Sequence, residues 1–455
     1  MDFSTRIAAY LATEQHQDER IRSAYELDPV SRHIYLKAKE FFWTVKRLAA
    51  RAESRGDAPG SNAPILVACE AQKRPRVLID MTATRRCGER TGIQRVVREI
   101  AKWSVAAGEG LPVFIEDGRL RSYYRHPSLP ETVEPAPGDK FLMLDASFCF
   151  VDEYRPIMRR IAASGGENVL GLHDILPLLY PGAFTGGAFL EFQRWFEALV
   201  PESDAIVCVS RSTAQSFVDY LARHDYPLDP GRRIGWWRLG ADLEPDGGRP
   251  SRRALAIGAT RAPFFLGVGT LEPRKGYSIA LDAFERLWAA GLDARYVIVG
   301  RRGWGSQALA QRIRAHEEID RRLFWLDDAD DASLRCLYER AHGLIAASFA
   351  EGFGLPLAEA AFHGLPVIAS DIPIFREIAG DHATFFPPLD ADALCAAIRA
   401  ALKRRGPRTP TRIVSWREST QTLLGMVRAG SYQWRSPRGV EARFEPERLP
   451  SAAAS

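Results

Sequence analysis

The chain has 455 residues, of which 46% are hydrophobic and 26% are charged, and its formal net charge is +4. This composition is typical of a globular protein, and the length suggests two or three domains. So small a positive charge gives no reason to expect a nucleic acid as partner.

The cysteine pattern and the lengths of the apolar runs indicate in which cellular compartment the protein is expected. The six cysteines are scattered and form no C-x-x-C pair. That pattern favours reduced thiols over disulfides or a zinc site. No apolar run reaches the roughly 18 residues of a membrane span, and the first residues do not have the pattern of a signal peptide. We therefore expect a cytoplasmic protein.

Residues 1–70 are predicted to form a helical N-terminal extension. Within it, residues 31–53 combine lysines and arginines with aliphatic and aromatic residues. A basic amphipathic helix of this kind either packs on the body of the protein or lies on an anionic membrane surface. The second interpretation would place the protein at the inner face of the plasma membrane.

Residues 71–250 are expected to form a first α/β domain. The expected strands are 76–81, 140–146, 168–173, 205–210 and 233–239, and the first helix is 92–103. Strands that alternate with helices are typical of a parallel sheet covered on both faces. Ligands bind such sheets at the carboxyl ends of the strands. The residues that follow each strand are therefore candidates for a site.

The loop between the first strand and the first helix, residues 80–99, is basic. It contains Arg85, Arg86, Arg90 and Arg95, and Gly92 can begin the helix. These arginines either bind an anion or an acceptor, or they are solvated or paired with acids of the same loop.

His173 and Asp174 lie where a later strand of this domain ends. A histidine there can hydrogen-bond a sugar hydroxyl or support a proton transfer. The alternative is a structural histidine held by a neighbouring carbonyl group.

The turn-rich span 240–263 is the best domain boundary, and residues 251–410 are expected to form a second α/β domain. Its expected strands are 264–270, 295–300, 322–328, 343–348, 366–370 and 383–388, and its first helix is 277–290. Two such series predict two doubly wound, Rossmann-like domains with parallel sheets.

The segment GVGTLEPRKGYS, residues 267–278, follows a strand and opens a helix. Gly269 and Gly276 frame a loop that presents Arg274 and Lys275 together. Adjacent cations at a helix N-terminus suit a diphosphate, and they would stabilise the charge on a departing nucleoside diphosphate. The alternative is a solvated basic loop.

The segment EGFGLPLAE, residues 351–359, also joins a strand to a helix, which is expected at 356–363. The glycines leave backbone N–H groups open to an anion, yet Glu351 and Glu359 repel anions. A ligand with both phosphates and hydroxyls, such as a nucleotide sugar, removes this conflict because carboxylates accept hydrogen bonds from hydroxyls. The alternative is a turn with two solvated glutamates.

A nucleoside pocket is a further hypothesis for residues 323–341. The backbone near Trp325 and Leu326 can bracket a base, and Leu334 can wall it. Simple core packing is the more economical interpretation of each of these residues by itself.

Together these segments resemble the retaining glycosyltransferases of family 4, which have the GT-B fold of two facing Rossmann-like domains. The resemblance covers about residues 76–425, and its most specific part is the E-x7-E motif at 351–359. GTLEPRKG, LYERAHGLIAASFAEGFG and REIAG match the same pattern in order. The element RTGIQRVVREI resembles bacterial members that build surface polysaccharides such as O-antigen, capsule or exopolysaccharide.

The resemblance implies roles for single residues. Arg274 and Lys275 would bind the donor diphosphate, and Glu359 would hydrogen-bond the ribose. Glu351 and the amides of Gly352, Phe353, Gly354 and Leu355 would hold the donor sugar and phosphate. His173 aligns with a histidine near the transferred sugar. The expected substrate-binding residues also include Gly269, Leu326 and Gly92.

The fold of this family implies that the chain crosses back after about residue 411, and that residues 415–430 form a helix on the first domain. The last residues, 431–455, are rich in Arg, Pro, Ser and Ala. We expect them to form a mobile tail.

The predicted function is a metal-independent transfer of a sugar, with retention, from a nucleotide sugar to a saccharide or lipid-linked glycan. GDP-mannose is the first donor that the resemblance suggests, and no cofactor is expected. Departure and attack on one face of the sugar is preferred over a double displacement. The alternatives are a GT-B phosphorylase, a nucleotide-sugar epimerase, or a nucleotide-sugar-binding module without catalysis.

Overall fold

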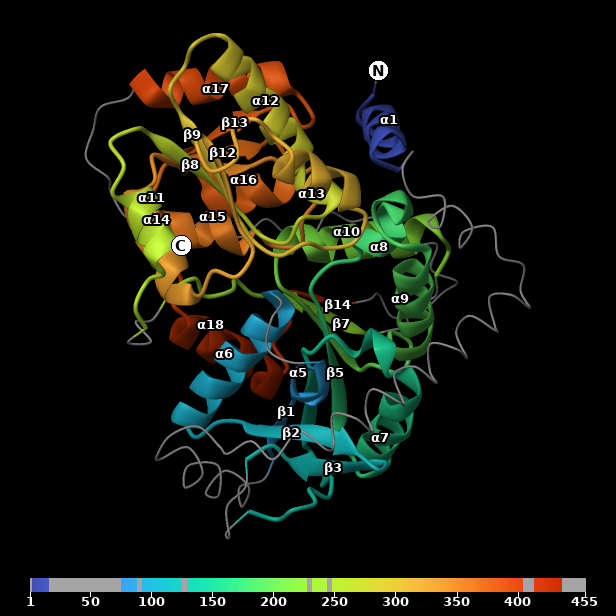
Figure 1. Ribbon diagram of the computed structural model, residues 1–455. Helices are drawn as coiled ribbons and strands as arrows, with labels where there is room; N and C mark the ends of the chain where they lie inside the picture. The colour runs from blue at the N-terminus through green and yellow to red at the C-terminus, as the bar shows by residue number, and fades with distance from the viewer. Residues whose placement is uncertain are drawn as a thin grey trace. The chain divides into compact units, whose positions relative to one another are not determined.

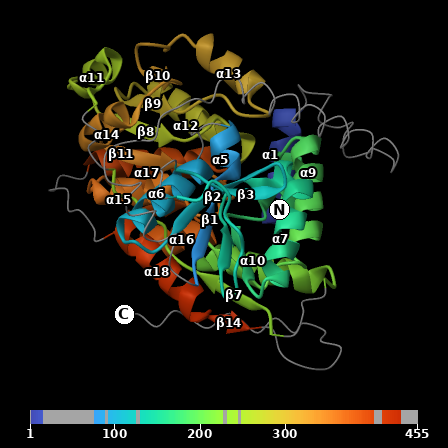
Figure 2. The same ribbon diagram turned by 90° about the horizontal axis from the view of Figure 1, so that it is seen from below.

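The computed structural model describes residues 2–15, 75–87, 92–124, 129–226, 231–243, 248–403 and 413–435. The basic helix expected at 31–53 lies outside the described residues. The chain divides into two compact units (Figures 1 and 2). The C-terminal unit contains residues 241–414, the helix α1 (Phe3–Gln15) and the segment Tyr180–Gly186, and the N-terminal unit contains the remaining described residues.

A mainly parallel sheet of eight strands forms the centre of the N-terminal unit, in the order β14-β7-β6-β5-β4-β1-β2-β3. Its strands are β1 (Val77–Asp80), β2 (Leu111–Glu116), β3 (Arg119–Ser122), β4 (Lys140–Met143), β5 (Glu167–Leu172), β6 (Ala205–Cys208), β7 (Arg233–Trp236) and β14 (Trp434–Arg435). All five strands expected in this half are confirmed. The order reverses between β1 and β4, and such a reversal is where doubly wound sheets bind ligands.

The helices of the N-terminal unit follow its strands. They are α5 (Thr82–Cys87), α6 (Gly92–Ala106), α7 (Val151–Ala163), α8 (Leu176–Leu179), α9 (Gly186–Leu199), α10 (Arg211–Arg223) and α18 (Trp416–Ala429). β1 and β6 are buried along their whole length. Strands covered on both faces are continuous apolar runs in the sequence, and these runs predicted the strands.

The antiparallel hairpin of β2 and β3 was not among the expected elements. Its turn is Asp117-Gly118, and both residues have positive φ, 50° and 69°. Asp-Gly between two alternating segments is a strong hairpin signal, because only a turn with positive φ at both positions matches the twist of the strands. The sequence therefore contains a local signal for this hairpin, although the hairpin is absent from the predicted elements.

The helix α18 packs against α6 in the N-terminal unit (Figure 1). It begins with a capping box between Ser415 and Glu418. A Cβ atom at Gly240 would lie 2.4 Å from the backbone of Trp416, so only glycine permits this close approach. Beyond α18, residues 434–435, which the sequence analysis assigns to a mobile tail, form β14 and pair with β7.

A parallel sheet of six strands forms the centre of the C-terminal unit, in the order β10-β9-β8-β11-β12-β13. Its strands are β8 (Phe264–Val268), β9 (Arg295–Val299), β10 (Leu323–Leu326), β11 (Gly343–Ala346), β12 (Val367–Ser370) and β13 (Ala383–Phe386). Each of the six expected strands is confirmed. The order reverses between β8 and β11, which are paired in parallel.

Helices cover both faces of this second sheet. They are α11 (Arg252–Gly258), α12 (Tyr277–Ala289), α13 (Gln307–Arg314), α14 (Asp331–Arg340), α15 (Leu355–Phe362), α16 (Pro373–Ala379) and α17 (Ala391–Lys403). Neighbouring residues of β8 belong to different apolar clusters: Phe265 packs in one, and Phe264 and Leu266 pack in the other. This alternation shows that each face of the sheet has its own core.

Among the helices of the described residues, none is long and apolar enough to span a membrane.

Candidate functional site

The topology of the C-terminal unit brings the two glycine-containing motifs together. One motif follows β8 and the other follows β11, and these strands are neighbours at the point where the strand order reverses. The loops are joined directly, because the Phe349 backbone N–H donates to the Arg274 carbonyl oxygen at 3.0 Å. The site therefore lies at the switch point of a doubly wound sheet.

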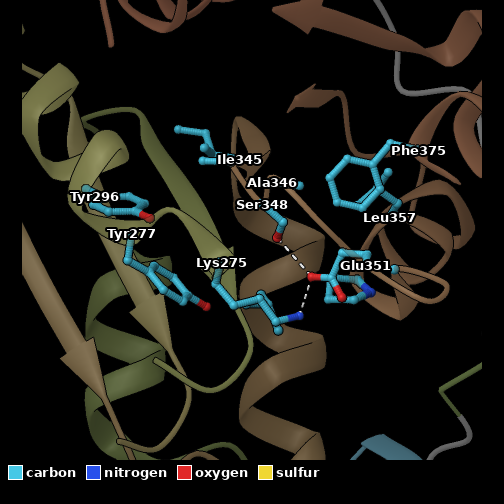
Figure 3. Close-up of a pocket in the computed structure, with 13 residues that line it drawn as sticks. Lys275, Tyr277, Tyr296, Ile345, Ala346, Ser348, Glu351, Leu357 and Phe375 are labelled. Atoms are coloured by element: carbon cyan, nitrogen blue, oxygen red, sulfur yellow. Dashed lines mark hydrogen bonds and ion pairs between the residues drawn. The ribbon is translucent and has the colours of Figure 1, made fainter. Parts of the chain in front are cut away.

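Arg274 and Lys275 converge on the carboxylate of Glu351. Lys275 Nζ lies 2.5 Å from Glu351 Oε1, and Arg274 Nη1 lies 2.7 Å from Glu351 Oε2. The Ser348 hydroxyl donates to Oε1 at 2.9 Å. In Figure 3 the lysine and the serine both point at this carboxylate. Each oxygen of Glu351 thus carries a charge-assisted hydrogen bond.

These partners determine the protonation state of Glu351. Its side chain is 8% exposed. Burial alone would raise the pKa of its carboxyl, but Arg274 and Lys275 outweigh burial and lower that pKa to about 2. Glu351 is therefore ionised throughout the physiological pH range.

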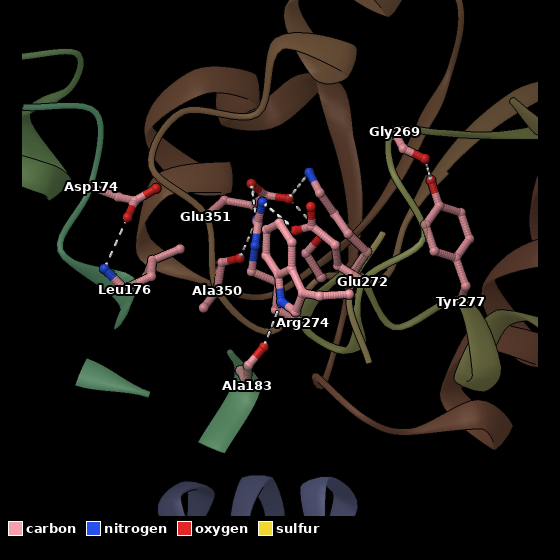
Figure 4. A network of polar contacts seen from close by, with 12 residues as sticks. Asp174, Leu176, Ala183, Gly269, Glu272, Arg274, Tyr277, Ala350 and Glu351 are labelled. Atoms are coloured by element: carbon pink, nitrogen blue, oxygen red, sulfur yellow. Dashed lines mark hydrogen bonds and ion pairs between the residues drawn. The ribbon is translucent and has the colours of Figure 1, made fainter. Parts of the chain in front are cut away.

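Glu272 is a second acid in this cluster, and the sequence analysis gave it no role. Its Oε2 lies 2.9 Å from Arg274 Nη2, so the guanidinium lies between two carboxylates (Figure 4). Burial raises the pKa of Glu272 in spite of the two nearby cations. It faces Arg274 because residue 272 immediately precedes the short 3-10 turn Pro273–Lys275.

Two glycines permit the tight geometry of these loops. Gly276 has φ of 63°, and a Cβ atom there would lie 2.2 Å from the Ala347 carbonyl oxygen. Gly354 has φ of 93° and caps the N-terminus of α15. Both conformations lie in the region that side chains other than glycine rarely adopt. The site thus depends on glycine both for backbone conformation and for close approach of the two loops.

The side chains of these loops surround a hollow of about 20 Å³, which Figure 3 shows with the residues that line it. Lys275, Glu351 and Gly354 are on its wall. About 15 Å³ of such volume is needed for a single water molecule. The hollow as it stands therefore has room for about one water molecule.

The amides expected to bind the donor belong to the turn before α15. Phe353 is 6% exposed, and its ring is therefore part of the core. Gly352 is also buried. Leu355 is the first residue of α15, and Pro356 follows it. This is the preferred place of proline in a helix, since the N–H it lacks would have no partner inside the helix.

Glu359 lies on α15 and is 4% exposed. Its Oε2 accepts a hydrogen bond from the Tyr338 hydroxyl at 2.8 Å. The ring of Tyr338 in turn stacks on His363, with 5.4 Å between the ring centres. The structure therefore shows a buried glutamate with an internal partner, not a solvated one.

Gly269 and Leu326 lie at the same carboxyl edge. Gly269 has φ of 131°, and its carbonyl accepts from the Tyr277 hydroxyl at 2.7 Å. The Leu326 side chain packs in the apolar core, and its carbonyl accepts from the backbone N–H of Gly300 at 2.9 Å. The side chain of Leu326 has the core role that the sequence analysis considered as the alternative.

His173 and Gly92 belong to the N-terminal unit. His173 directly follows β5, and its Nε2 lies 2.8 Å from the Leu144 carbonyl oxygen. Because a carbonyl oxygen only accepts, Nε2 must carry a proton. Burial lowers the pKa of the imidazole, and the bond to Leu144 opposes that shift only in part. Gly92 begins α6 and is exposed.

The arginines of the loop 80–99 do not share one role. Arg86 makes a two-point ion pair with Glu153, with both N–O distances at 2.9 Å. Arg85 instead places its guanidinium 4.1 Å from the centre of the Phe114 ring. Arg86 is therefore a structural residue, while Arg85 lines a hollow of about 570 Å³ beside the β2–β3 hairpin. Arg90 lies outside the described residues.

Sequence reasoning missed a pair of buried acids at the switch point of the N-terminal sheet. Asp80 ends β1, and it accepts hydrogen bonds from the hydroxyls of Thr82 and Tyr154, both at 2.5 Å. Asp145 follows β4 and accepts from the Thr84 backbone N–H at 2.6 Å. Burial, and then the charge of Asp145, raise the pKa of Asp80. Only the neighbouring positions of β1 and β4 bring the two together.

Comparison with known proteins identifies related sequences and structures. Residues 255–415 match the family described as glycosyl transferases group 1. The chain is 34% identical over 373 residues to the serotype-specific mannosyltransferase WbdA of Escherichia coli, an alignment that covers 77% of this chain and 44% of WbdA. It is also 34% identical over 175 residues to the O-antigen chain mannosyltransferase B of the same organism. This alignment covers 38% of this chain and 42% of that protein. The chain thus spans less than half the length of these relatives.

Among solved structures, the sucrose-phosphate synthase from Thermosynechococcus elongatus is similar with a TM-score of 0.51 and 18% identity. The similarity covers 79% of this chain and 96% of that chain. At this identity it shows the fold, which is GT-B with two Rossmann-like domains. Residues 255–415 therefore belong to the glycosyl transferases group 1, within a chain of GT-B fold.

Proposed function

We propose that this protein transfers a sugar, with retention, from a nucleotide sugar to a saccharide or lipid-linked glycan in bacterial surface polysaccharide synthesis. The observation that carries the proposal is the convergence of Arg274 and Lys275 on Glu351 at the switch point of the C-terminal sheet. GDP-mannose is the first donor to test, since the relatives WbdA and O-antigen chain mannosyltransferase B are named as mannosyltransferases.

Charge balance supports a diphosphate as the ligand of this site. Arg274 and Lys275 are the cations, and in this structure Glu351 pairs with both of them while Glu272 pairs with Arg274. A diphosphate offers both cations a stronger partner, and it releases the Glu351 carboxylate to accept hydrogen bonds from sugar hydroxyls. The same cations would stabilise the charge that grows on the departing nucleoside diphosphate, the work that a metal ion does in other transferases.

The role of Glu351 bears on the route of transfer. The resemblance assigns this carboxylate to the donor sugar, and a carboxylate released from its two cations can accept hydrogen bonds from the sugar hydroxyls. We therefore assign Glu351 to sugar binding rather than to a covalent intermediate. The leaving group and the acceptor then use the same face of the sugar, and the acceptor proton passes to the leaving phosphate oxygen.

We assign the acceptor to the N-terminal unit. The hollow of about 570 Å³ near Arg85 is large enough for sugar units, and Tyr123 and Tyr124 lie on its wall. Aromatic rings beside charged groups suit a ligand with apolar faces and hydroxyl edges. His173 is proposed to act near the transferred sugar. A peripheral membrane contact through residues 31–53 remains an expectation from the sequence.

One incubation tests the function. The purified protein is mixed with GDP-mannose and a manno-oligosaccharide in the presence of EDTA, and the product is examined by NMR for the anomeric configuration of the new bond. We expect an α-linked product from the α-configured donor, without added metal. Transfer that requires inorganic phosphate would indicate a phosphorylase, and a changed donor without acceptor would indicate an epimerase. Donor binding with neither product would indicate a binding module; all three outcomes overturn the proposal.

A further inference from the structure

The N-terminal helix α1 packs on the C-terminal unit, next to the cationic loop. Its buried residues Ile7 and Leu11 are 5% and 7% exposed, while Thr5 and Ala8 are exposed. Residues 7 and 11 share one face of a helix, and Tyr10 lies on the same face. Arg6 anchors the helix through a 2.7 Å hydrogen bond from Nη2 to the Pro388 carbonyl oxygen. α1 is therefore a docked element of this unit.

Tyr10 reaches the turn that carries the two cations. Its hydroxyl lies 3.1 Å from the Pro273 carbonyl oxygen and 2.8 Å from Ser278 Oγ. Pro273 directly precedes Arg274, and Ser278 lies in the first turn of α12. One hydroxyl thus connects both ends of the segment that presents Arg274 and Lys275.

Tyr10 also supports the loop that carries Glu351. Its ring meets Phe349 edge to face, with 6.0 Å between the ring centres, and Tyr180 meets the same ring at 5.7 Å. Phe349 is 1% exposed, and its backbone N–H donates to the Arg274 carbonyl oxygen. The phenylalanine precedes Glu351 by two positions. Tyr10 therefore contacts both loops of the site.

We propose that Tyr10 is a positioning residue, whose hydroxyl holds the turn Pro273–Ser278 in the conformation that directs Arg274 and Lys275 towards the donor diphosphate. The inference rests on the proposed function for the identity of the ligand. Its physical basis is local: a 3-10 turn of three residues has little stability of its own, so an external hydrogen bond reduces its freedom. Tyr10 touches the loop and not the reacting atoms.

Two matched variants test the role of the hydroxyl. Tyr10→Phe keeps the ring against Phe349 and removes the hydroxyl that contacts the turn at Pro273 and Ser278. Arg6→Ala removes a hydrogen bond from the same helix to the same unit, but at Pro388, away from the turn. Hydrogen–deuterium exchange followed by mass spectrometry then compares the peptides that cover residues 3–15 and 270–281 in the full chain.

We expect Tyr10→Phe to raise the exchange rate of the peptide 270–281 by about tenfold, the effect of one lost hydrogen bond, and Arg6→Ala to leave it unchanged. Equal exchange in wild type and Tyr10→Phe would overturn the proposal. An equal rise in both variants while the peptide 3–15 exchanges as in wild type would also overturn it, because the loss of the Tyr10 hydroxyl would then have no specific effect. The exchange of the peptide 3–15 shows in each variant whether the helix stays docked.

Kinetics with GDP-mannose add a second measurement, the donor KM, which a purely structural role of Tyr10 would leave unchanged. Tyr10→Phe is expected to raise the donor KM and to lower kcat/KM by about tenfold at an unchanged melting temperature, while Arg6→Ala keeps wild-type kinetics. Wild-type kinetics in Tyr10→Phe would contradict the positioning role. If the wild type transfers no sugar, the proposed function fails, and the exchange experiment still decides whether Tyr10 orders the turn.

Discussion

Lys275 Nζ lies 2.5 Å from Glu351 Oε1, although the two residues are 76 positions apart in the chain. Arg274 Nη1 lies 2.7 Å from the other oxygen of the same carboxylate. The three side chains thus form one cluster of charges. The cluster identifies which cations a phosphate ligand would meet and which carboxylate it would release.

The first prediction concerns the leaving group. Lys275→Ala should reduce kcat/KM for sugar transfer by about 10²–10³, because a preorganised charge at the developing phosphate is removed. The fold should remain, since Glu351 keeps Arg274 and Ser348 as partners. Radiolabelled transfer and circular dichroism measure the two effects. Arg399→Ala, at an exposed position of α17, serves as the control, and wild-type activity in Lys275→Ala would show that the leaving-group assignment is wrong.

The second prediction concerns acid stability. The pKa of Glu351 is about 2 in the folded protein against an ordinary value of 4.5. A carboxyl whose pKa is lowered by folding stabilises the protein fully above its unfolded pKa, and this stabilisation is lost as the pH falls towards the folded value. At pH 5, Glu351→Gln should therefore have a lower free energy of unfolding than wild type. This deficit should shrink between pH 5 and pH 3 by an amount on the order of 2 kcal/mol.

Urea unfolding at several pH values measures this deficit. Asp371→Asn is the matched control, because Arg376 also lowers the pKa of Asp371, but at an exposed position. Exposed ion pairs contribute little, so its deficit should be small at every pH. A Glu351→Gln deficit that does not depend on pH would contradict the ion-pair geometry.

The third prediction uses two glycines with similar backbone angles. Gly276→Ala combines positive φ with a Cβ atom 2.2 Å from the Ala347 carbonyl oxygen, whereas Gly291→Ala has φ of 79° and no atom within 4 Å of the added Cβ. Gly291→Ala should cost about 1 kcal/mol of stability from backbone strain alone. Gly276→Ala should cost more, and it should also abolish binding of GDP if the proposed GDP-mannose donor is correct. Chemical unfolding and calorimetry measure both effects, and equal costs would argue against the close contact of the loops.

The fourth prediction separates Glu359 from its internal partner. If Glu359 binds the ribose, Glu359→Gln should raise the donor KM by about tenfold with little change in kcat, because a charged acceptor is replaced by a neutral one. Tyr338→Phe removes the hydrogen bond that the Tyr338 hydroxyl donates to Glu359. It should leave the donor KM near that of wild type. A KM that rises in Tyr338→Phe and not in Glu359→Gln would reverse the assignment.

The fifth prediction concerns the protonation of His173. Burial lowers the pKa of its imidazole below the ordinary 6.5, and Nε2 donates to the Leu144 carbonyl group. Imidazole NMR should therefore show a neutral ring, protonated at Nε2, at pH 7. Because the unfolded chain takes up the proton first, this histidine should reduce stability as the pH falls below about 6.5. A cationic ring at pH 7 would contradict the burial that lowers the pKa of this imidazole.

A large part of the fold could be predicted from the sequence, because buried parallel strands are continuous apolar runs. β8 and β11 were located in this way, and so were the loops that follow them. The β2–β3 hairpin was missed, although its Asp117-Gly118 turn carries a local signal. The residues 1–70 were expected to be helical, but nothing in their pattern indicates that Tyr10 contacts Pro273.

The sequence by itself determined which residues the site contains: two cations after one strand, and a glycine turn with two acids after another. A family resemblance assigned roles to these residues. The tertiary structure decided which of these residues meet. The strand order places β8 beside β11, and this brings Arg274 and Lys275 to Glu351, while α1 contacts both loops through Tyr10. Local patterns report which residues are buried. They do not report strand order, which is set by long-range packing, and for that reason only the folded chain shows the charge cluster.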